Sequence, residues 1–318
     1  MRSVPGRGLG RDLREGRFEG MAYDSVGYRS AARALAVGLF MAGSLLGAKA
    51  GPNDEGDKAL AAQDYARAMT LYRQAADGND AWGQVNVGKM YENGQGVAKS
   101  PKQAAVWYAK AANQGNDWAQ NSLGSLYENG TGVPKDIAKA AALYKKSAAK
   151  GNNWALYNLA RFQAEGIGMK ANPAESLKNF RKAAEAGNSW AQYTLGDKYA
   201  TGEGVPPSYP TAVGWYKKAA DQDNAWSQFK LGQLYEKGTG VVQNDATAAK
   251  YYKASAEQGN HLAQASYGLA LETGKGLKRW NKAEAVRYYK LAVANPGAPA
   301  WVLQRLTALD GPQPKPAN

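Results

Sequence analysis

Apolar and small side chains return every three or four residues along most of this chain, which is the spacing of amphipathic helices. One segment, which follows residue 100 and ends at Gly115, places Ala104, Tyr108 and Ala111 on one side of a helix. The next segment starts at Trp118 and places Ala119, Leu123 and Tyr127 on one side. The pattern therefore predicts two amphipathic helices in succession.

This two-helix pattern repeats every 36 residues from Asp57 to about Asn295. Two glycine columns carry the period: Gly94, Gly130, Gly166, Gly202, Gly238 and Gly274, and, two residues later, Gly96, Gly132, Gly168, Gly204, Gly240 and Gly276. A polar column holds Asp64, Ser100, Asp136, Asn172, Ser208 and Asn244, and an aromatic column holds Tyr72, Tyr108, Tyr144, Phe180, Tyr216, Tyr252 and Tyr288. Four columns in register over six units indicate an internal repeat.

Each column has a physical role in a helix–turn–helix unit. The Gly-x-Gly pair lets the backbone take a positive φ, so it ends one helix in a tight turn. The Asp, Ser or Asn that follows caps the next helix, because its side chain accepts a hydrogen bond from a free N–H group. A second stop comes at Gly-Asn pairs such as Gly115-Asn116.

One helix pair cannot bury its own apolar face, so the units must stack on one another. The sequence therefore predicts an all-α fold, a right-handed α-solenoid of stacked antiparallel helix pairs with a 36-residue repeat. The predicted parts are a linker at 51–56, a half-repeat at 57–78 that supplies only a second helix, six repeats at 79–295, a capping helix at 296–310 and a disordered tail at 311–318.

Residues 1–50 have the pattern of an export leader. Arg29 and Arg33 precede an apolar stretch at 34–47, and Ala48-Lys49-Ala50 supplies the small residues of a cleavage site. This order is typical of a secretory signal peptide, cut here after Ala50, with Met21 as a possible true start. We therefore expect a periplasmic or secreted bacterial protein. No apolar run reaches the roughly 18 residues of a transmembrane helix.

The repeat unit resembles the Sel-one-like repeat, a relative of the tetratricopeptide repeat. The resemblance is carried by residues 119–133 and 140–149 and by Gly151-Asn152, and it extends over residues 57–295. Four positions depart from the pattern: Ala160 for glycine, Gln163 and Leu271 for tyrosine, and Trp280 for the last capping residue. The family implies a non-catalytic adaptor that holds protein partners, in bacteria often at the cell envelope.

Composition removes most catalytic chemistry. The chain has no cysteine and one histidine, His261, so disulfides, thiolate sites, multi-histidine metal sites and the usual catalytic triads are excluded. Residues 83–89 match the spacing of a phosphate loop, but they lie on a predicted helix and Met90 follows them. We predict no catalytic residue, metal or cofactor, and a hydrolase is the most distant of the three functional hypotheses.

The positive net charge can favour anionic partners, but its distribution along the chain argues against a nucleic-acid partner. The formal charge is +13, of which residues 1–50 carry +4 and residues 51–318 carry +9. No dense basic run of the kind found in nucleic-acid arms is present. A lysine column at Lys110, Lys146, Lys182 and Lys218 recurs every 36 residues, and it is interpreted as a solvated helix face or as a contact for an anionic partner.

The candidate binding residues form a tryptophan column, Trp82, Trp118, Trp154, Trp190 and Trp226, again with a spacing of 36. On a helical wheel, Trp118 lies well away from the core side that Ala119, Leu123 and Tyr127 define. The indoles are therefore expected at the edge of the core or outside it.

Two interpretations of this column remain. In one, each indole packs on the preceding Gly-Asn turn and seals adjacent units. In the other, the rings form a ladder for a peptide or a glycan strand. The leading functional hypothesis is a non-catalytic envelope scaffold for protein partners, and the alternative is a glycan- or peptidoglycan-binding module.

Overall fold

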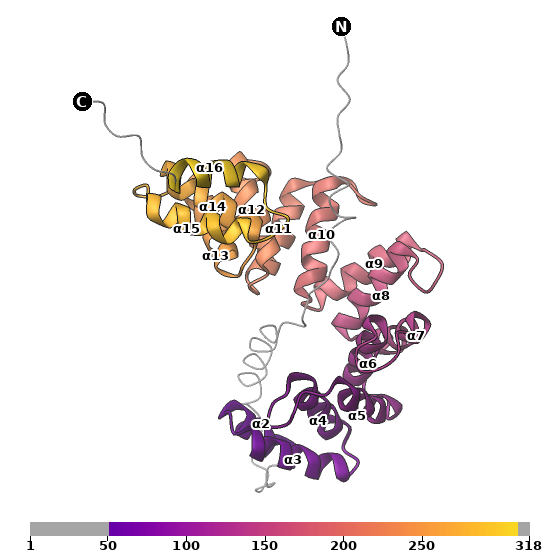
Figure 1. Cartoon of the computed structure of the whole chain (residues 1–318). Helices are drawn as coiled ribbons and strands as arrows, with labels where there is room; N and C mark the ends of the chain where they lie inside the picture. Colours follow the sequence, from indigo (N-terminus) through magenta and orange to yellow (C-terminus); the bar gives the residue numbers. More distant parts are fainter. Residues whose placement is uncertain (1–50, 311–318) are drawn as a thin grey trace, which may run out of the picture. The chain divides into compact units, whose positions relative to one another are not determined.

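The computed structural model describes residues 51–310, and the predicted leader and C-terminal tail lie outside them. Within these residues the chain forms fifteen helices and no strand. The helices follow one another in chain order as antiparallel pairs, and each pair packs on the pair before it and the pair after it (Figure 1). This arrangement is the predicted α-solenoid of stacked helix pairs.

Seven pairs can be distinguished, each with a first and a second helix. The first helices are α2 (Pro52–Ala61), α4 (Ala81–Asn93), α6 (Asp117–Asn129), α8 (Asn153–Glu165), α10 (Ser189–Thr201), α12 (Ala225–Lys237) and α14 (His261–Thr273). The second helices are α3 (Tyr65–Asp77), α5 (Pro101–Asn113), α7 (Ile137–Ala148), α9 (Pro173–Glu185), α11 (Tyr209–Ala220), α13 (Asp245–Glu257) and α15 (Lys282–Val293). A final helix, α16 (Ala300–Asp310), packs on α15.

The predicted helix boundaries are confirmed at both kinds of turn. Gly130 ends α6 in the left-handed conformation with φ 69°, and Asp136 then caps α7 by accepting a hydrogen bond from the backbone of Lys139. At the other turn, Gly151 has φ 85° and Asn152 caps α8. Glycine is also required at 132, because a Cβ there would lie 2.3 Å from the carbonyl carbon of Pro101 in the preceding pair.

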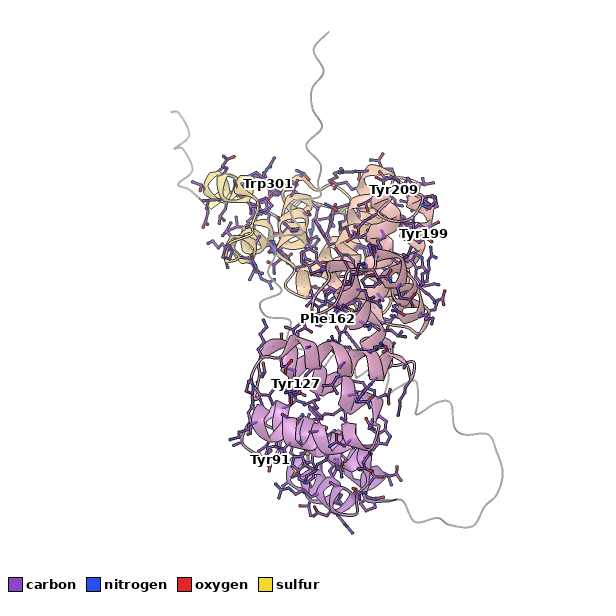
Figure 2. The ribbon with its side chains drawn as sticks, turned by 90° about the vertical axis from the view of Figure 1, so that its right-hand side faces the viewer. Tyr91, Tyr127, Phe162, Tyr199, Tyr209 and Trp301 are labelled. Atoms are coloured by element: carbon purple, nitrogen blue, oxygen red, sulfur yellow. The ribbon has the colours of Figure 1, made fainter. Side chains whose placement is uncertain are left out.

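The centre of every pair except the fourth is a tyrosine of the second helix that lies against a glycine of the first. A Cβ built on Gly88, Gly124, Gly196, Gly232 or Gly268 would lie 2.5–2.9 Å from the tyrosine ring of its pair. The ring of Tyr144 is fully buried, and Phe162 of the next pair meets it edge-on at 5.3 Å. Figure 2 labels Tyr91, Tyr127 and Phe162, which are aromatic residues of the first helices of three successive pairs.

The first pair corrects the predicted linker at 51–56 and the half-repeat at 57–78. Residues 52–61 form α2, so the described part of the chain begins with a complete pair. Gly56 lies against the ring of Tyr72, as the glycines of the later pairs do. Only residues 62–64 join the two helices, without a Gly-x-Gly turn, so the shorter connection takes α2 out of the 36-residue register and hides it from a search by period.

The last pair corrects the aromatic and capping columns by one residue. Asn281, not position 280, caps α15, and Tyr289, not Tyr288, lies against Gly268. One extra residue in the turn before α15 accounts for both shifts. Within residues 296–310, α16 covers Ala300–Asp310; its Val302 is fully buried and its Trp301 meets Tyr289 edge-on at 6.1 Å.

We predict that Gly196→Ala destabilises the protein, although alanine is the better helix former. The new Cβ would lie 2.5 Å from the ring of Tyr216, and overpacking of this kind costs about 1–3 kcal/mol. Urea unfolding monitored by circular dichroism measures the change.

The matched control is Gly214→Ala on the neighbouring helix α11. A Cβ at Gly214 meets nothing within 4 Å, so this change should stabilise the protein by about 0.5–1 kcal/mol. Equal effects of the two alanines on the free energy of unfolding would contradict the packing described for Gly196.

Candidate functional site

The tryptophan column lies at the start of the first helices. Trp82, Trp118, Trp154, Trp190 and Trp226 each stand two residues after the capping Asp or Asn of their helix. Trp82 is 47% exposed and the other four are partly buried. Five large aromatic rings thus occupy one helical position in five consecutive pairs, and none of them is fully buried.

The indoles contact side chains of neighbouring pairs as well as their own helix. Lys89 of α4 places its ammonium group 4.9 Å from the ring centre of Trp118 in the next pair. Trp226 meets His261 of the following pair edge-on at 6.4 Å, and Trp190 meets Tyr193 on its own helix at 6.1 Å. These contacts hold the rings in place while leaving part of each ring accessible.

The residue one turn after each tryptophan is polar, but its burial and its bonding partner differ from one pair to the next. Asn158 is buried and donates a hydrogen bond to Asn121 of the preceding pair, at 3.1 Å. Lys230 pairs with Asp197 of the preceding pair at 3.2 Å. These positions therefore join adjacent first helices, a role that the helical wheel of a single unit does not reveal.

A second column, which the sequence analysis did not identify, holds a carboxylate in six of the seven first helices, all but α8. It accepts the hydroxyl hydrogen bond of the buried tyrosine of its own pair: Tyr72 to Asp57, Tyr108 to Glu92, Tyr144 to Glu128, Tyr216 to Asp197, Tyr252 to Glu236 and Tyr289 to Glu272, at 2.5–2.7 Å. Burial, together with the carboxylate, raises the pKa of Tyr216 far above its ordinary value. These tyrosines therefore stay neutral and donate.

Four of these carboxylates also bind a cation from the next part of the stack. Arg161 pairs with Glu128, Lys230 with Asp197, Lys275 with Glu236 at 3.1 Å, and Arg305 of α16 with Glu272 at 2.8 Å. Each carboxylate thus connects the tyrosine of one pair to the following pair. The repeated carboxylates of the first helices therefore have a structural role.

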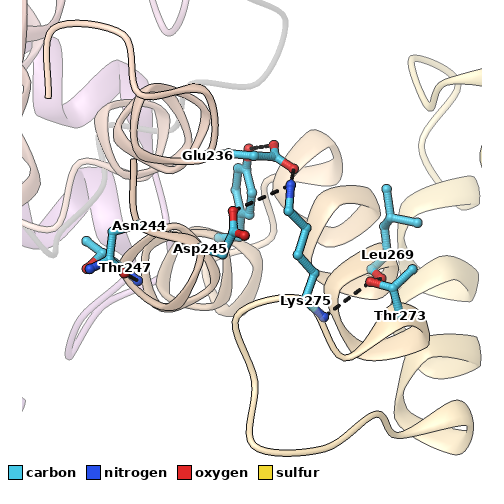
Figure 3. Close-up of polar contacts among 8 residues, drawn as sticks. Glu236, Asn244, Asp245, Thr247, Leu269, Thr273 and Lys275 are labelled. Atoms are coloured by element: carbon cyan, nitrogen blue, oxygen red, sulfur yellow. Dashed lines mark hydrogen bonds and ion pairs between the residues drawn. The ribbon is translucent and has the colours of Figure 1, made fainter. Parts of the chain in front are cut away.

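The junction of the last two pairs shows this arrangement in detail (Figure 3). Lys275 extends from the turn after α14 towards Glu236 and Asp245, and Glu236 in turn accepts from Tyr252. The same side chains line an open cavity of about 250 Å³, together with Ser266 and small apolar residues. Its only cation is the ammonium group of Lys275, which already contacts both carboxylates.

The described part of the chain contains no cluster of side chains arranged for catalysis or for metal binding. No three His, Asp or Glu side chains of residues 51–310 gather where they could hold a metal ion. His261 stands at the start of α14 beside Trp226, and burial lowers its pKa. None of the helices found in this region is both long and apolar enough to cross a membrane.

The stacked helix pairs define a helical-repeat protein of the tetratricopeptide-like class. A sequence model of the Sel1 repeat matches residues 54–80, 83–116, 119–152, 155–188, 191–224, 227–260 and 261–295. The chain belongs to the Sel1 repeat family. Repeats of this family generally mediate protein–protein interactions, and such scaffolds are generally non-catalytic.

Solved structures of the same family are similar over most of the chain. A Sel1 repeat protein from Oxalobacter formigenes is 32% identical with a TM-score of 0.70, over 76% of this chain and 98% of that one. The protein c5321, described as a protective antigen of uropathogenic Escherichia coli, is 36% identical with a TM-score of 0.64 over 76% of this chain. This chain covers 51% of the c5321 chain. A comparison with curated proteins found no match.

One charged side chain beside the tryptophan column gives a prediction about pH. Burial lowers the pKa of Lys89 to about 8, while Asp57 and Glu92 oppose the shift. Between pH 8 and 10 the unfolded chain therefore keeps a proton on Lys89 that the folded chain has lost, so this lysine makes folding more favourable as pH rises. The free energy of unfolding of the wild type, relative to Lys89→Met, should increase by about 1–3 kcal/mol over this interval.

Urea unfolding at several pH values tests this expectation, with Lys237→Met as an exposed control lysine. The control removes an exposed lysine, so it separates the effect of burial from that of a lost charge. A difference between wild type and Lys89→Met that stays constant from pH 7 to 10 would contradict the buried setting of Lys89.

Proposed function

We propose that this protein is a non-catalytic interaction scaffold of the cell envelope, which binds protein partners through the tryptophan column of its first helices. The observation that carries the proposal is the repeated, partly exposed indole at one helical position in five consecutive pairs. Tryptophan is enriched among residues that dominate binding energy, since it supplies a large apolar face at a small entropic cost.

The framework behind these rings supports the proposal. Each first helix is tied to its neighbours by side chains such as Gln120, which donates to the carbonyl of Ala112, and Arg161, which pairs with Glu128. Rings on a rigid framework lose little conformational freedom when a partner binds, so more of the contact energy remains as affinity. The envelope location rests on the predicted leader at residues 1–50.

The glycan-binding hypothesis uses the same rings, because flat aromatic faces also stack on sugars. Protein partners are favoured by two observations. The family generally binds proteins, and the contacts of Trp118 with Lys89 and of Trp226 with His261 leave no uninterrupted row of bare ring faces.

We expect Trp118→Ala combined with Trp154→Ala to weaken partner binding about tenfold or more, since each ring offers the contact area of a binding hot spot. Cross-linking pull-downs from an envelope fraction, quantified for the same partner bands, measure the loss. The matched control is Trp107→Ala combined with Trp215→Ala. These indoles lie on second helices, where Lys110 and Lys218 cover them at 4.0 and 4.3 Å.

Titration of the intrinsic tryptophan fluorescence with cell-wall glycan fragments runs in parallel. The proposal expects no shift or quenching at about millimolar fragment, which is the weak end of specific binding. A fluorescence change that the Trp118/Trp154 variant loses would establish the glycan alternative instead. Unchanged partner recovery by that variant would show that the column only seals the repeats.

A further inference from the structure

The two layers of the solenoid carry charges of opposite sign. The seven first helices hold 6 Lys and Arg against 10 Asp and Glu, a net charge of −4. The seven second helices hold 17 Lys and Arg against 6 Asp and Glu, a net charge of +11. The excess positive charge of the described residues is thus concentrated on one layer. The 36-residue repeat by itself does not require such a separation of charge.

Within that layer, seven exposed cations form what we call the basic band. They are Lys110 on α5, Lys145 and Lys146 on α7, Arg181 and Lys182 on α9, and Lys217 and Lys218 on α11. All seven lie towards the C-terminal ends of four consecutive second helices. These ends are neighbours in space, since Lys150 after α7 donates to the carbonyl of Gly115 after α5 at 2.5 Å.

The cations of the band form no ion pair with a carboxylate of residues 51–310, although Glu185 and Asp221 follow Lys182 and Lys218 by three residues. Other lysines on the same layer do form ion pairs: Lys139 with Asp136, Lys178 with Glu175, and Lys253 with Glu257. No ion pair forms at any of the seven band positions within the described structure, and two of the lysines instead cover the rings of Trp107 and Trp215. A negatively charged partner would therefore relieve the repulsion among these like charges.

Helix stability does not account for the band. A cation near a helix C-terminus gains about 0.3–1 kcal/mol from the helix dipole. Yet α3 and α13 have no basic residue in the last turn and form the same pairs. The seven band cations lie on the helices between these two, from α5 to α11, whereas Lys290 in the last turn of α15 pairs with Asp310.

We propose that the basic band is a second docking surface, separate from the tryptophan column, and that its partner is an acidic segment of a protein in extended conformation. One lysine side chain, Lys150, bridges the ends of α5 and α7, so these ends lie about one helix diameter, roughly 10 Å, apart. An extended chain in the polyproline II conformation advances about 3.1 Å per residue with three residues per turn, so side chains at every third residue share one face about 9 Å apart. A segment with a carboxylate at every third residue therefore matches the band from one second helix to the next.

An acidic protein segment fits the band better than a membrane surface does. A peripheral helix enters a bilayer with several exposed apolar side chains. Of the large exposed apolar side chains in residues 51–310, Val106 alone lies within one turn of a band cation, Lys110. Trp107 and Trp215 are partly buried beneath lysines. Binding here depends on charge and spacing, which an ordered row of carboxylates supplies.

The band and the tryptophan column share an edge of the solenoid but lie on different helices. The end of α7 adjoins the start of α6, where Ser147 donates to the carbonyl of Asp117 at 2.7 Å. A test of the proposal must therefore separate the two surfaces. The Trp118→Ala/Trp154→Ala variant serves this purpose, because it leaves every band cation in place.

The experiment measures binding of a fluorescent peptide of about 12 residues with glutamate at every third position, a length that spans four helices. The band variant carries Lys145→Gln, Lys146→Gln, Arg181→Gln and Lys182→Gln. The charge-matched control carries Arg67→Gln, Lys237→Gln, Lys278→Gln and Arg279→Gln, four exposed cations outside the band. Circular dichroism melts confirm that both variants fold, as expected for exposed positions.

We expect the wild type to bind the peptide, with an affinity that falls as salt screens the charges. The band variant should lose about tenfold or more in affinity, and the charge-matched control no more than about threefold. The tryptophan variant should bind the peptide as the wild type does. If the tryptophan variant failed to bind envelope partners, that result would bear on the proposed function and not on the basic band.

Three results would overturn the proposal. The first is no binding of the peptide by the wild type. The second is an equal loss in the band variant and the charge-matched control, which would show that only net charge matters. The third is stronger binding to phosphatidylglycerol vesicles than to the peptide, lost in the band variant, which would identify a membrane surface as the partner.

Discussion

The structure depends on one repeated contact: a tyrosine ring of the second helix pressed against a glycine of the first and held there by its hydroxyl group. Gly124, Tyr144 and Glu128 show the arrangement, with the hydroxyl hydrogen bond at 2.7 Å. The missing glycine side chain lets the two backbones approach, and the carboxylate fixes where the ring lies. Because Arg161 of the next pair binds the same carboxylate, the contact that closes one pair also sets the position of the next. The first-helix and second-helix faces are therefore presented in a fixed register, on which any binding by either face depends.

The fourth pair shows what happens when this contact is altered. It has Ala160 in place of glycine and Phe180 in place of tyrosine, so both the close approach and the hydroxyl group are absent. Two other hydrogen bonds join its helices, from Ser176 to the carbonyl of Ala160 at 2.7 Å and from Asn179 to Gln163 at 2.8 Å. A phenylalanine ring has no hydroxyl group to bind a carboxylate, so it can shift to make room for a methyl group. The replacements at positions 160 and 180 are therefore two parts of one change in packing.

Much of the fold could be predicted from the sequence, because glycine and capping residues report backbone conformation directly. The Gly-x-Gly and Gly-Asn turns lie where the 36-residue period places them. The errors at α2 and at Tyr289 arose where a connection changes length, which a fixed period cannot detect. The candidate site was harder to predict. A helical wheel placed Trp118 at the edge of the core, but its contact with Lys89 comes from another pair. The carboxylate column was visible as recurring glutamates, yet its link to the tyrosines needs the spatial pairing of two helices.

The most direct test of this account is a double-mutant cycle between Gly196 and Tyr216, measured as free energies of unfolding in urea for Gly196→Ala, Tyr216→Phe and the double variant. If the hydroxyl bond to Asp197 pins the ring against the glycine, alanine should cost much less beside phenylalanine than beside tyrosine. The predicted coupling is about 1 kcal/mol or more, within the range measured for residues in contact. Additive effects of the two changes would contradict the account, because the ring would then not be held by its hydroxyl group.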